Sequence, residues 1–437
     1  MTLSTLRRSL LAGALVALAP LGTGCDFNLD DPNTVGEDTV FNTRDGLLVA
    51  AVGLQELYNV GTLDNVVITP GITTRELAAN TTFANLLELE DGGSTLNNTN
   101  ANVGGLFGQL YRVLAYAESI RDGVDGIEQL PAAERAGLGA LADFYRAVAI
   151  GTLAQNFEQV ALETDGDGQA TYSSNDDAFE RAADLLEGAE AALATEGAAV
   201  PTPAGFDLLN TVRAYRARYE LFAGNDEAAI AAADRVDPGA TSTFDYEGEA
   251  RSTLFANLVD GTPSFAPRDN LGIEGIDPAD GRIAFHLDPL AELSDPNDYP
   301  IDALATPYLQ SAGGSVPAYV PGELDLIRAE ASLNLGRADD AVAFINAVRT
   351  KTADEDPFGI GAGLGAYDGP TGDGALRQEI FRQRAAELYL QGLRLVDSRR
   401  LDGQGVGSGA FDRTRTFYPY PFQERNDNPN TPADPSI

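Results

Sequence analysis

The sequence contains no tryptophan and only one histidine, one cysteine and one lysine. A single cysteine cannot form a disulfide within the chain. The missing tryptophan removes a stacking surface that carbohydrate-binding proteins often use. No G-x-S-x-G element, phosphate-binding loop, Cys/His metal spacing or H-E-x-x-H motif occurs, so no local signature of catalysis or of a metal or cofactor site is present. The single histidine, His286, lies between Phe285 and Leu287 and is expected to be structural.

Basic residues are also scarce: 29 stand against 66 acidic ones, which gives a formal net charge of −37. So acidic a chain repels nucleic acids and anionic lipid headgroups, and we interpret the acidic residues as a solvated coat. Two of the 66 acids could still form the carboxylate pair of a glycoside hydrolase, although no motif indicates it. The length of 437 residues, 43% of them hydrophobic, is sufficient for one large or two ordinary domains.

Residues 1–24 have the pattern of a secretory signal. Arg7 and Arg8 precede an apolar run at 10–18 that is too short to span a bilayer. The run ends in Gly24-Cys25, which resembles a bacterial lipoprotein cleavage site with Cys25 as the lipidated first residue. The alternative is a plain secretory signal with an incidental cysteine, and we favour lipidation.

The segment from Asp165 to Gln169 reads D-G-D-G-Q and invites comparison with a calcium-binding loop. An EF-hand loop requires glycine at its sixth position and a bidentate acid at its twelfth. Counting from Asp165, these positions hold Ala170 and Asp176. We therefore favour a surface loop without a metal ion.

Apolar residues recur at helical spacing in several stretches of the first half. Helices are expected over 44–58, 104–120, 134–157 and 178–194. Thr43 and Ser174 stand where N-caps of the first and fourth helices are expected. The intervening residues 59–103 are rich in Asn, Thr and Gly and are expected to form loops and turns, with one short helix around 75–89.

Two stretches of the second half show the same helix-turn-helix pattern. Residues 206–236 and 321–348 superpose with Gly224 on Gly336, each where a helix C-terminus favours a residue with positive φ. This repeat is of the tetratricopeptide type. A further one-faced helix is expected over 381–395, where Gly392 would mark a close helix contact.

These stretches carry the resemblance to a known family. The A-E-A and I-N-x-V-R elements of the second pair resemble the C-terminal half of SusD/RagB-type nutrient-binding lipoproteins. The pattern R-x-x-E-L-x-x-x-G-x-R-x-x-D and a terminal P-x-P-x-x-E-x-x-x-N-P segment, with Tyr420 in place of the usual Ile, resemble the same family. The first of these patterns consists of Arg384, Glu387, Leu388, Gly392, Arg394 and Asp397, and the second runs from Pro419 to Pro429.

The resemblance implies a mostly α fold in which tetratricopeptide-type helix pairs form a framework carrying long loop insertions. Residues 25–437 would form the nutrient-binding domain, with an N-terminal part at 25–236, a variable loop region at 237–320 and a C-terminal part at 321–437. It also implies a non-catalytic, surface-exposed outer-membrane lipoprotein. Such a protein delivers a nutrient, commonly an oligosaccharide, to a SusC-like, TonB-dependent transporter.

Sugars stack on aromatic rings and receive hydrogen bonds from polar side chains. Phe107 aligns with a binding aromatic of the family. The full candidate set for ligand contact is Tyr58, Asn65, Phe107, Tyr246, Tyr299 and Tyr319. With tyrosine and phenylalanine in place of tryptophan, we expect weak, reversible binding of a neutral or cationic solute. Two other functions stay open: a secreted tetratricopeptide-type adaptor that binds a protein or peptide, and a glycoside hydrolase.

Overall fold

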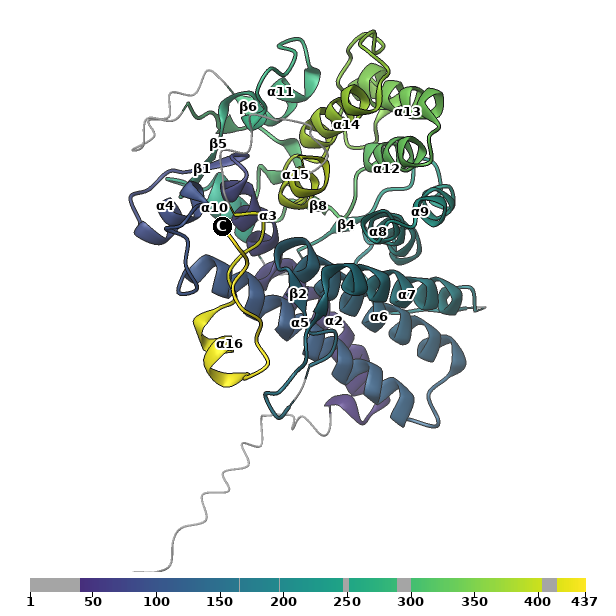
Figure 1. Ribbon diagram of the computed structural model, residues 1–437. Helices are drawn as coiled ribbons and strands as arrows, with labels where there is room; N and C mark the ends of the chain where they lie inside the picture. The colour runs from purple at the N-terminus through teal and green to yellow at the C-terminus, as the bar shows by residue number, and fades with distance from the viewer. Residues whose placement is uncertain (1–39, 165, 196, 247–250, 289–299, 403–414) are drawn as a thin grey trace, which may run out of the picture.

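The computed structural model describes residues 40–164, 166–195, 197–246, 251–288, 300–402 and 415–437. The predicted signal at 1–24, the predicted lipidation site Cys25 and the ligand candidate Tyr299 lie outside the described residues. So does Asp165, the first residue of the acidic loop. Figure 1 shows a molecule built mainly of helices, with short strand pairings between them, so the mostly α prediction is confirmed.

Four long helices dominate the first half of the chain: α2 (Arg44–Gly61), α5 (Ala101–Gly126), α6 (Ala132–Asn156) and α7 (Asn175–Leu193). Helix α6 packs against both α5 and α7 and is buried along most of its length. The two predicted caps are confirmed. Thr43 Oγ1 accepts a hydrogen bond from the Gly46 amide at 3.1 Å, and Ser174 forms a reciprocal capping box with Asp177.

The two predicted helix pairs are α8 (Leu208–Phe222) with α9 (Asp226–Ala233), and α12 (Pro321–Asn334) with α13 (Ala338–Thr350). Gly224 and Gly336 end the first helix of each pair with φ of 80° and 76°. Helix α9 packs against α12, so the pairs form one continuous row with α7, along one side of the molecule in Figure 1. The predicted tetratricopeptide-type framework is confirmed.

The expectation of loops over 59–103 is wrong in part. This stretch contains α3 (Leu63–Thr73), β1 (Leu77–Ala79) and α4 (Ala84–Asp91), and the short helix expected at 75–89 begins only at Ala84. Helix α3 is buried on nearly every side, so its sequence shows no one-faced period. Its β-branched residues, Pro70 and Gly71 also lower intrinsic helix propensity, and burial overrides that propensity.

The single helix expected over 381–395 is also wrong. Helix α14 (Asp373–Glu387) ends before a turn, and α15 (Arg394–Asp402) begins after it. Leu390 and Gly392 in this turn have φ of 61° and 71°. The close approach expected at Gly392 exists, but it is to α3: a Cβ on Gly392 would lie 2.4 Å from the Val66 carbonyl oxygen. A side chain there would collide with backbone.

The described part of 237–320, which the resemblance predicts to be a variable loop region, consists of short elements joined by irregular segments. Antiparallel pairings connect β4 to β8 and β6 to β7 within the region, and connect β5 to β1 outside it. The elements are β4 (Thr243–Phe244), α10 (Thr253–Leu258), β5 (Phe265–Pro267), η1 (Asp269–Gly272), α11 (Gly281–His286), β6 (Leu287–Asp288), β7 (Ala303–Leu304), η2 (Pro307–Leu309) and β8 (Val316–Pro317). The remaining elements of the described chain are β2 (Gln159–Val160), β3 (Ser173–Ser174), η3 (Ala353–Glu355) and α16 (Phe422–Asp427).

Candidate functional site

The charged residues of the α14–α15 motif are all buried and engaged in contacts within the fold. Arg384 Nε donates to Asp397 Oδ2 at 2.9 Å and so joins the two helices. Arg394 donates to the Leu271 carbonyl oxygen at 2.7 Å, which holds η1 of the loop region against the frame. These residues hold neighbouring elements of the fold together, and they offer no accessible group for a ligand.

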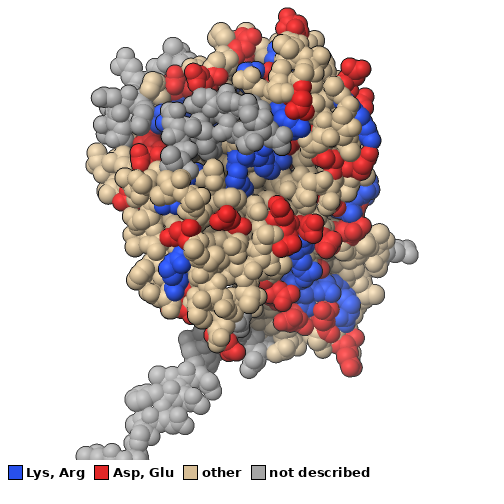
Figure 2. All heavy atoms as spheres, viewed as in Figure 1, with Lys and Arg blue, Asp and Glu red and all other residues tan. Residues whose placement is uncertain are grey.

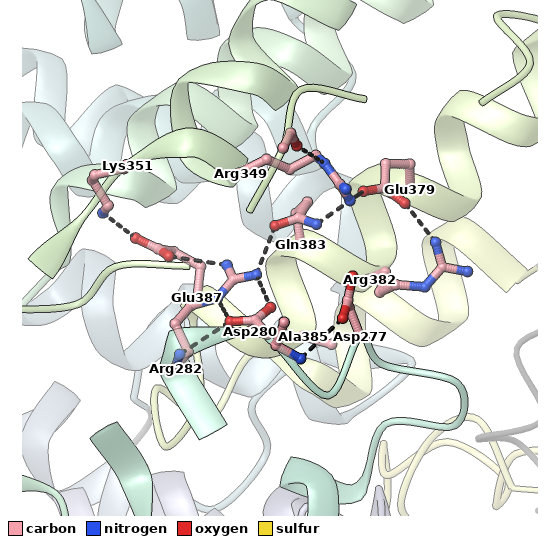
Figure 3. Close-up of polar contacts among 12 residues, drawn as sticks. Asp277, Asp280, Arg282, Arg349, Lys351, Glu379, Arg382, Gln383, Ala385 and Glu387 are labelled. Carbon is pink, nitrogen blue, oxygen red and sulfur yellow. Dashed lines mark hydrogen bonds and ion pairs between the residues drawn. The ribbon is translucent and has the colours of Figure 1, made fainter. Parts of the chain in front are cut away.

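Glu387 of the same motif lies at the centre of a buried charge cluster (Figure 3). Its carboxylate accepts hydrogen bonds from Lys351 Nζ at 2.5 Å and from Arg282 Nη1 at 3.1 Å. Lys351 Nζ also donates to Asp356 Oδ2 at 2.6 Å, and Arg282 Nη2 also donates to Asp280 Oδ2 at 2.6 Å. We call these five residues the Glu387 cluster. It joins α11, the segment after α13, and α14.

The contacts continue from the Glu387 cluster along α14, as Figure 3 shows. Arg282 donates to Gln383 at 2.7 Å, and Gln383 donates to Glu379 at 2.9 Å. The Glu379 carboxylate accepts hydrogen bonds from Arg349 Nη1 and from Arg382 Nη1, each at 2.5 Å. Each carboxylate in this chain of contacts therefore has a basic partner, which is what allows the charges to be buried.

Lys351 is the only lysine of the sequence, and its side chain is 13% exposed. Burial by itself would lower the pKa of the Lys351 amine, but the neighbouring Glu387 and Asp356 carboxylates raise it above its ordinary value. The amine is therefore kept protonated. It stabilises two carboxylates and is not poised to act as a base or a nucleophile.

The only histidine is also structural, as expected. His286 is fully buried, and its Nδ1 lies 2.9 Å from Thr306 Oγ1. Burial, with a smaller contribution from Arg282, lowers the pKa of His286 to about 3. The ring is neutral near pH 7 and has no access to solvent.

Three of the predicted ligand-contact residues lie in the hydrophobic core. The Tyr58 ring packs 5.1 Å from Phe244, and Tyr319 is buried with its hydroxyl 3.4 Å from the Ala240 carbonyl oxygen. Phe107 packs 4.6 Å from Tyr111, in a different aromatic group. None of the three presents a ring face to solvent, and the structure does not bring Phe107 together with the others.

Asn65 and Tyr246 are half-buried and come together around a residue that the sequence did not single out, Asp64. Asn65 Nδ2 donates to Asp64 Oδ1 at 3.1 Å, and Asn257 Nδ2 lies 3.4 Å from Asp64 Oδ2. Burial raises the pKa of Asp64, and burial and then the Asp64 charge contribute to the raised pKa of Tyr246. We call Asp64, Asn65, Tyr246 and Asn257 the Asp64 corner. No arginine or lysine among the described residues pairs with Asp64.

A groove begins beside this corner and runs along α2. Asp245, which lines the groove, directly precedes Tyr246 of the corner in the sequence. The groove has a volume of about 190 Å³. We call it the α2 groove; it is lined by Val52, Gln55, Glu56, Asn59, Val60, Pro201, Thr202, Pro203 and Asp245.

Amide hydrogen bonds hold the two walls of the α2 groove in place. Gln55 Nε2 donates to the Pro201 carbonyl oxygen at 2.7 Å, and Asn59 Nδ2 donates to the Asp245 carbonyl oxygen at 3.0 Å. Val52 is 48% exposed at the mouth of the groove. An apolar wall with a few convergent polar groups is the usual composition of a small-molecule site, so the α2 groove and the Asp64 corner form the candidate site.

Another groove of the surface has its central acid paired with basic side chains. Figure 2 shows acidic and basic side chains interspersed over the viewed face. In a groove between α7 and α8, Arg213 and Arg235 each lie 2.9 Å from Glu190, and Arg216 lies 3.4 Å from it. The α2 groove differs because its acids have no basic partner among the described residues.

The described residues contain no group of three or more His, Cys, Asp or Glu side chains arranged to hold a metal ion. Among the helices that the structure describes, none combines the length and apolarity needed to cross a lipid bilayer.

Neither a protein-family model nor a curated protein matches the sequence. Solved structures of other proteins do align with this chain. A SusD superfamily protein of Bacteroides vulgatus aligns over 90% of this chain and 99% of its own at 17% identity, with a TM-score of 0.68. A protein of the same species described as a putative sugar-binding protein also aligns over 90% of this chain and 99% of its own. Its identity is 14% and its TM-score is 0.68. NanU of B. fragilis aligns over 93% of this chain and 99% of its own at 14% identity, with a TM-score of 0.67.

The chain therefore has the SusD fold over nearly all of its length. This finding supports the resemblance to the SusD/RagB family that the sequence motifs indicate. At these identities the likeness establishes the fold alone.

Proposed function

We propose that this chain is a non-catalytic binding protein for a carbohydrate nutrient. The observation that carries the proposal is the SusD fold, shared over 90% of the chain with SusD superfamily proteins and with a putative sugar-binding protein. The candidate site is consistent with it, because the Asp64 corner offers two amides, a carboxylate and a phenol ring to a polyhydroxylated ligand.

We further propose that the mature chain begins at lipidated Cys25, sits on the outer surface of the outer membrane and passes an oligosaccharide to a SusC-like, TonB-dependent transporter. The signal-like residues 1–24 and the Gly24-Cys25 pair support anchoring. The row of tetratricopeptide-type pairs also fits a peptide-binding adaptor. The SusD fold accounts for the same row, so we prefer the nutrient-binding function.

Binding and cleavage can be separated in one experiment. Purified protein is incubated with a panel of oligosaccharides, and both binding and released reducing ends are measured. We expect reversible binding in the micromolar range or weaker, because fast release suits transfer to a transporter, with no reducing ends released. Cleavage that persists through rigorous purification would replace this proposal with a hydrolase.

Anchoring is tested independently of the ligand by Cys25→Ser. Expressed in a bacterium that processes lipoproteins, the wild type should fractionate with the outer membrane and the variant should be soluble. Ser4→Ala, within the proposed signal, serves as the control. A variant that stays with the membrane would show that Cys25 does not anchor the chain.

A further inference from the structure

The α2 groove contains two ionisable side chains, Glu56 and Asp245, and both are acidic. Glu56 is exposed and makes no hydrogen bond or ion pair with any described residue. Asp245 is fixed in position because its carboxylate accepts from Thr243 Oγ1 at 2.7 Å and from the Gly205 amide at 3.2 Å. The groove thus holds two negative charges, and no described residue that lines it is basic.

The amide side chains of the groove use most of their donors within the fold. Gln55 Nε2 donates to the carbonyl oxygens of both Ala51, at 2.9 Å, and Pro201, at 2.7 Å. Asn59 Nδ2 donates to the Asp245 carbonyl oxygen, while Asn59 Oδ1 is buried without a partner. The two carboxylates of the groove offer only acceptors, and the side-chain donors that remain are the Thr202 hydroxyl and the second N–H of the buried Asn59 amide.

A ligand that fits must supply hydrogen-bond donors and, to balance the carboxylates, positive charge. An ammonium group has three donors and no acceptor, which matches such a site better than a hydroxyl group. The wall formed by Val52, Val60, Pro201 and Pro203 is aliphatic and suits the C–H face of a sugar ring. The groove volume of about 190 Å³ is below the roughly 300–1,000 Å³ of sites for drug-sized ligands, so we assign it to one sugar unit and not to a whole oligosaccharide.

We propose that the α2 groove binds a single amino-sugar unit through its free, protonated amine, with Glu56 as the main partner of the ammonium group. This assignment rests on the proposed carbohydrate-binding function and narrows it to amine-bearing saccharides. It also gives the high negative charge of the chain a local role, because the surrounding acidic residues attract a cationic ligand and repel an anionic one.

The test compares two ligands that differ only at the amine: glucosamine oligosaccharides and their fully N-acetylated counterparts, titrated calorimetrically at low salt. The amine-bearing ligand should bind at least tenfold more tightly, a difference of about 1.4 kcal/mol. The preference should shrink at 0.5 M NaCl, because salt screens exposed charges. It should also shrink as the pH is raised and the amine loses its proton.

Two variants localise the effect. Glu56→Gln should remove most of the preference, whereas Glu274→Gln makes the same change in net charge at an exposed glutamate outside the groove and should retain it. Both positions are exposed, so neither variant should unfold the chain. Loss of the preference in both variants would show a general charge effect and overturn the assignment to this groove.

The remaining outcomes distinguish the proposed ammonium site from the proposed carbohydrate binding on which it rests. Equal binding of both ligands, or binding only of other sugars in the panel, would overturn the ammonium site and leave carbohydrate binding in place. Failure of every sugar in the panel to bind would overturn both.

Discussion

The Glu387 cluster and the α2 groove use acidic residues in opposite ways. In the cluster, Glu387 and Asp356 are fully buried, and each is in contact with Lys351. In the groove, Glu56 and Asp245 have no basic partner among the described residues. A net charge of −37 therefore does not describe a uniform coat. In the cluster, basic residues accompany acids that are buried, whereas the groove leaves its acids unpaired where solvent or a ligand can reach them.

The physical basis of this division is the free energy of burying charge. An unpaired carboxylate inside a protein loses its hydration, whereas a paired one recovers much of that loss through its partner. An exposed carboxylate keeps its hydration and needs no partner. Pairing thus distinguishes acids that stabilise the fold from acids that are available for binding, and the following substitutions test that distinction.

The largest effect is expected for Lys351→Met. Removal of the amine leaves Asp356 buried without its basic partner, and leaves Glu387 with Arg282 alone. Breaking one side of a buried ion pair typically costs about 3–5 kcal/mol of unfolding free energy. Urea denaturation should show this as a lower midpoint with an unchanged slope.

The matched control is Arg337→Met. Arg337 also pairs with a glutamate, Glu227, but the two side chains are 44% and 65% exposed. Exposed pairs contribute under about 1 kcal/mol. Equal losses in the two variants would show that burial does not separate the two kinds of acid.

A smaller effect of opposite sign is expected for Asp64→Asn. Burial raises the pKa of Asp64 above its ordinary 3.8, so the folded chain binds this proton more tightly than the unfolded chain does. That stabilising contribution is complete below pH 3.8 and is lost as the pH rises through the folded-state pKa. Near pH 7 the charged carboxylate therefore destabilises the folded chain, and the variant should melt at a higher temperature than the wild type.

The gain from Asp64→Asn should shrink when the pH is lowered from 7 to 4, because a larger fraction of the wild-type carboxyl is then protonated. Asn257 can turn its amide oxygen toward the new side chain, so hydrogen bonding is retained. Asp122→Asn, at an exposed position, should leave the melting temperature unchanged at both values. A wild type that is more stable than Asp64→Asn at pH 7 would show that Asp64 has a basic partner after all.

The framework could be predicted from sequence because its helices carry one apolar face and recognisable ends. Thr43, Ser174, Gly224 and Gly336 mark such ends, and the structure places each at a helix boundary. Helix α3 was missed because it is buried all round. The α14–α15 turn was missed because Leu390, which no turn rule favours at positive φ, adopts φ of 61° there.

The candidate site was harder to predict because its residues come from distant segments. Glu56 on α2 meets Pro201 and Asp245 only after folding, and no short motif encodes that meeting. The choice of aromatic residues also favoured core positions. Tyr58 follows Leu47 and Leu54 on the buried stripe of α2, and that spacing already indicated a core residue. Asn65, the polar residue of the candidate set, is part of the Asp64 corner.

The pairing of Lys351 with two carboxylates also affects how the protein reacts with carbonyl compounds. Reducing sugars form Schiff bases with unprotonated lysine amines, and the only lysine here is enclosed and kept protonated by two carboxylates. All other basic side chains except His286 are arginine. The folded chain should therefore be glycated slowly at lysine. Amine-directed dyes and cross-linkers should likewise label the side chains of the folded protein slowly.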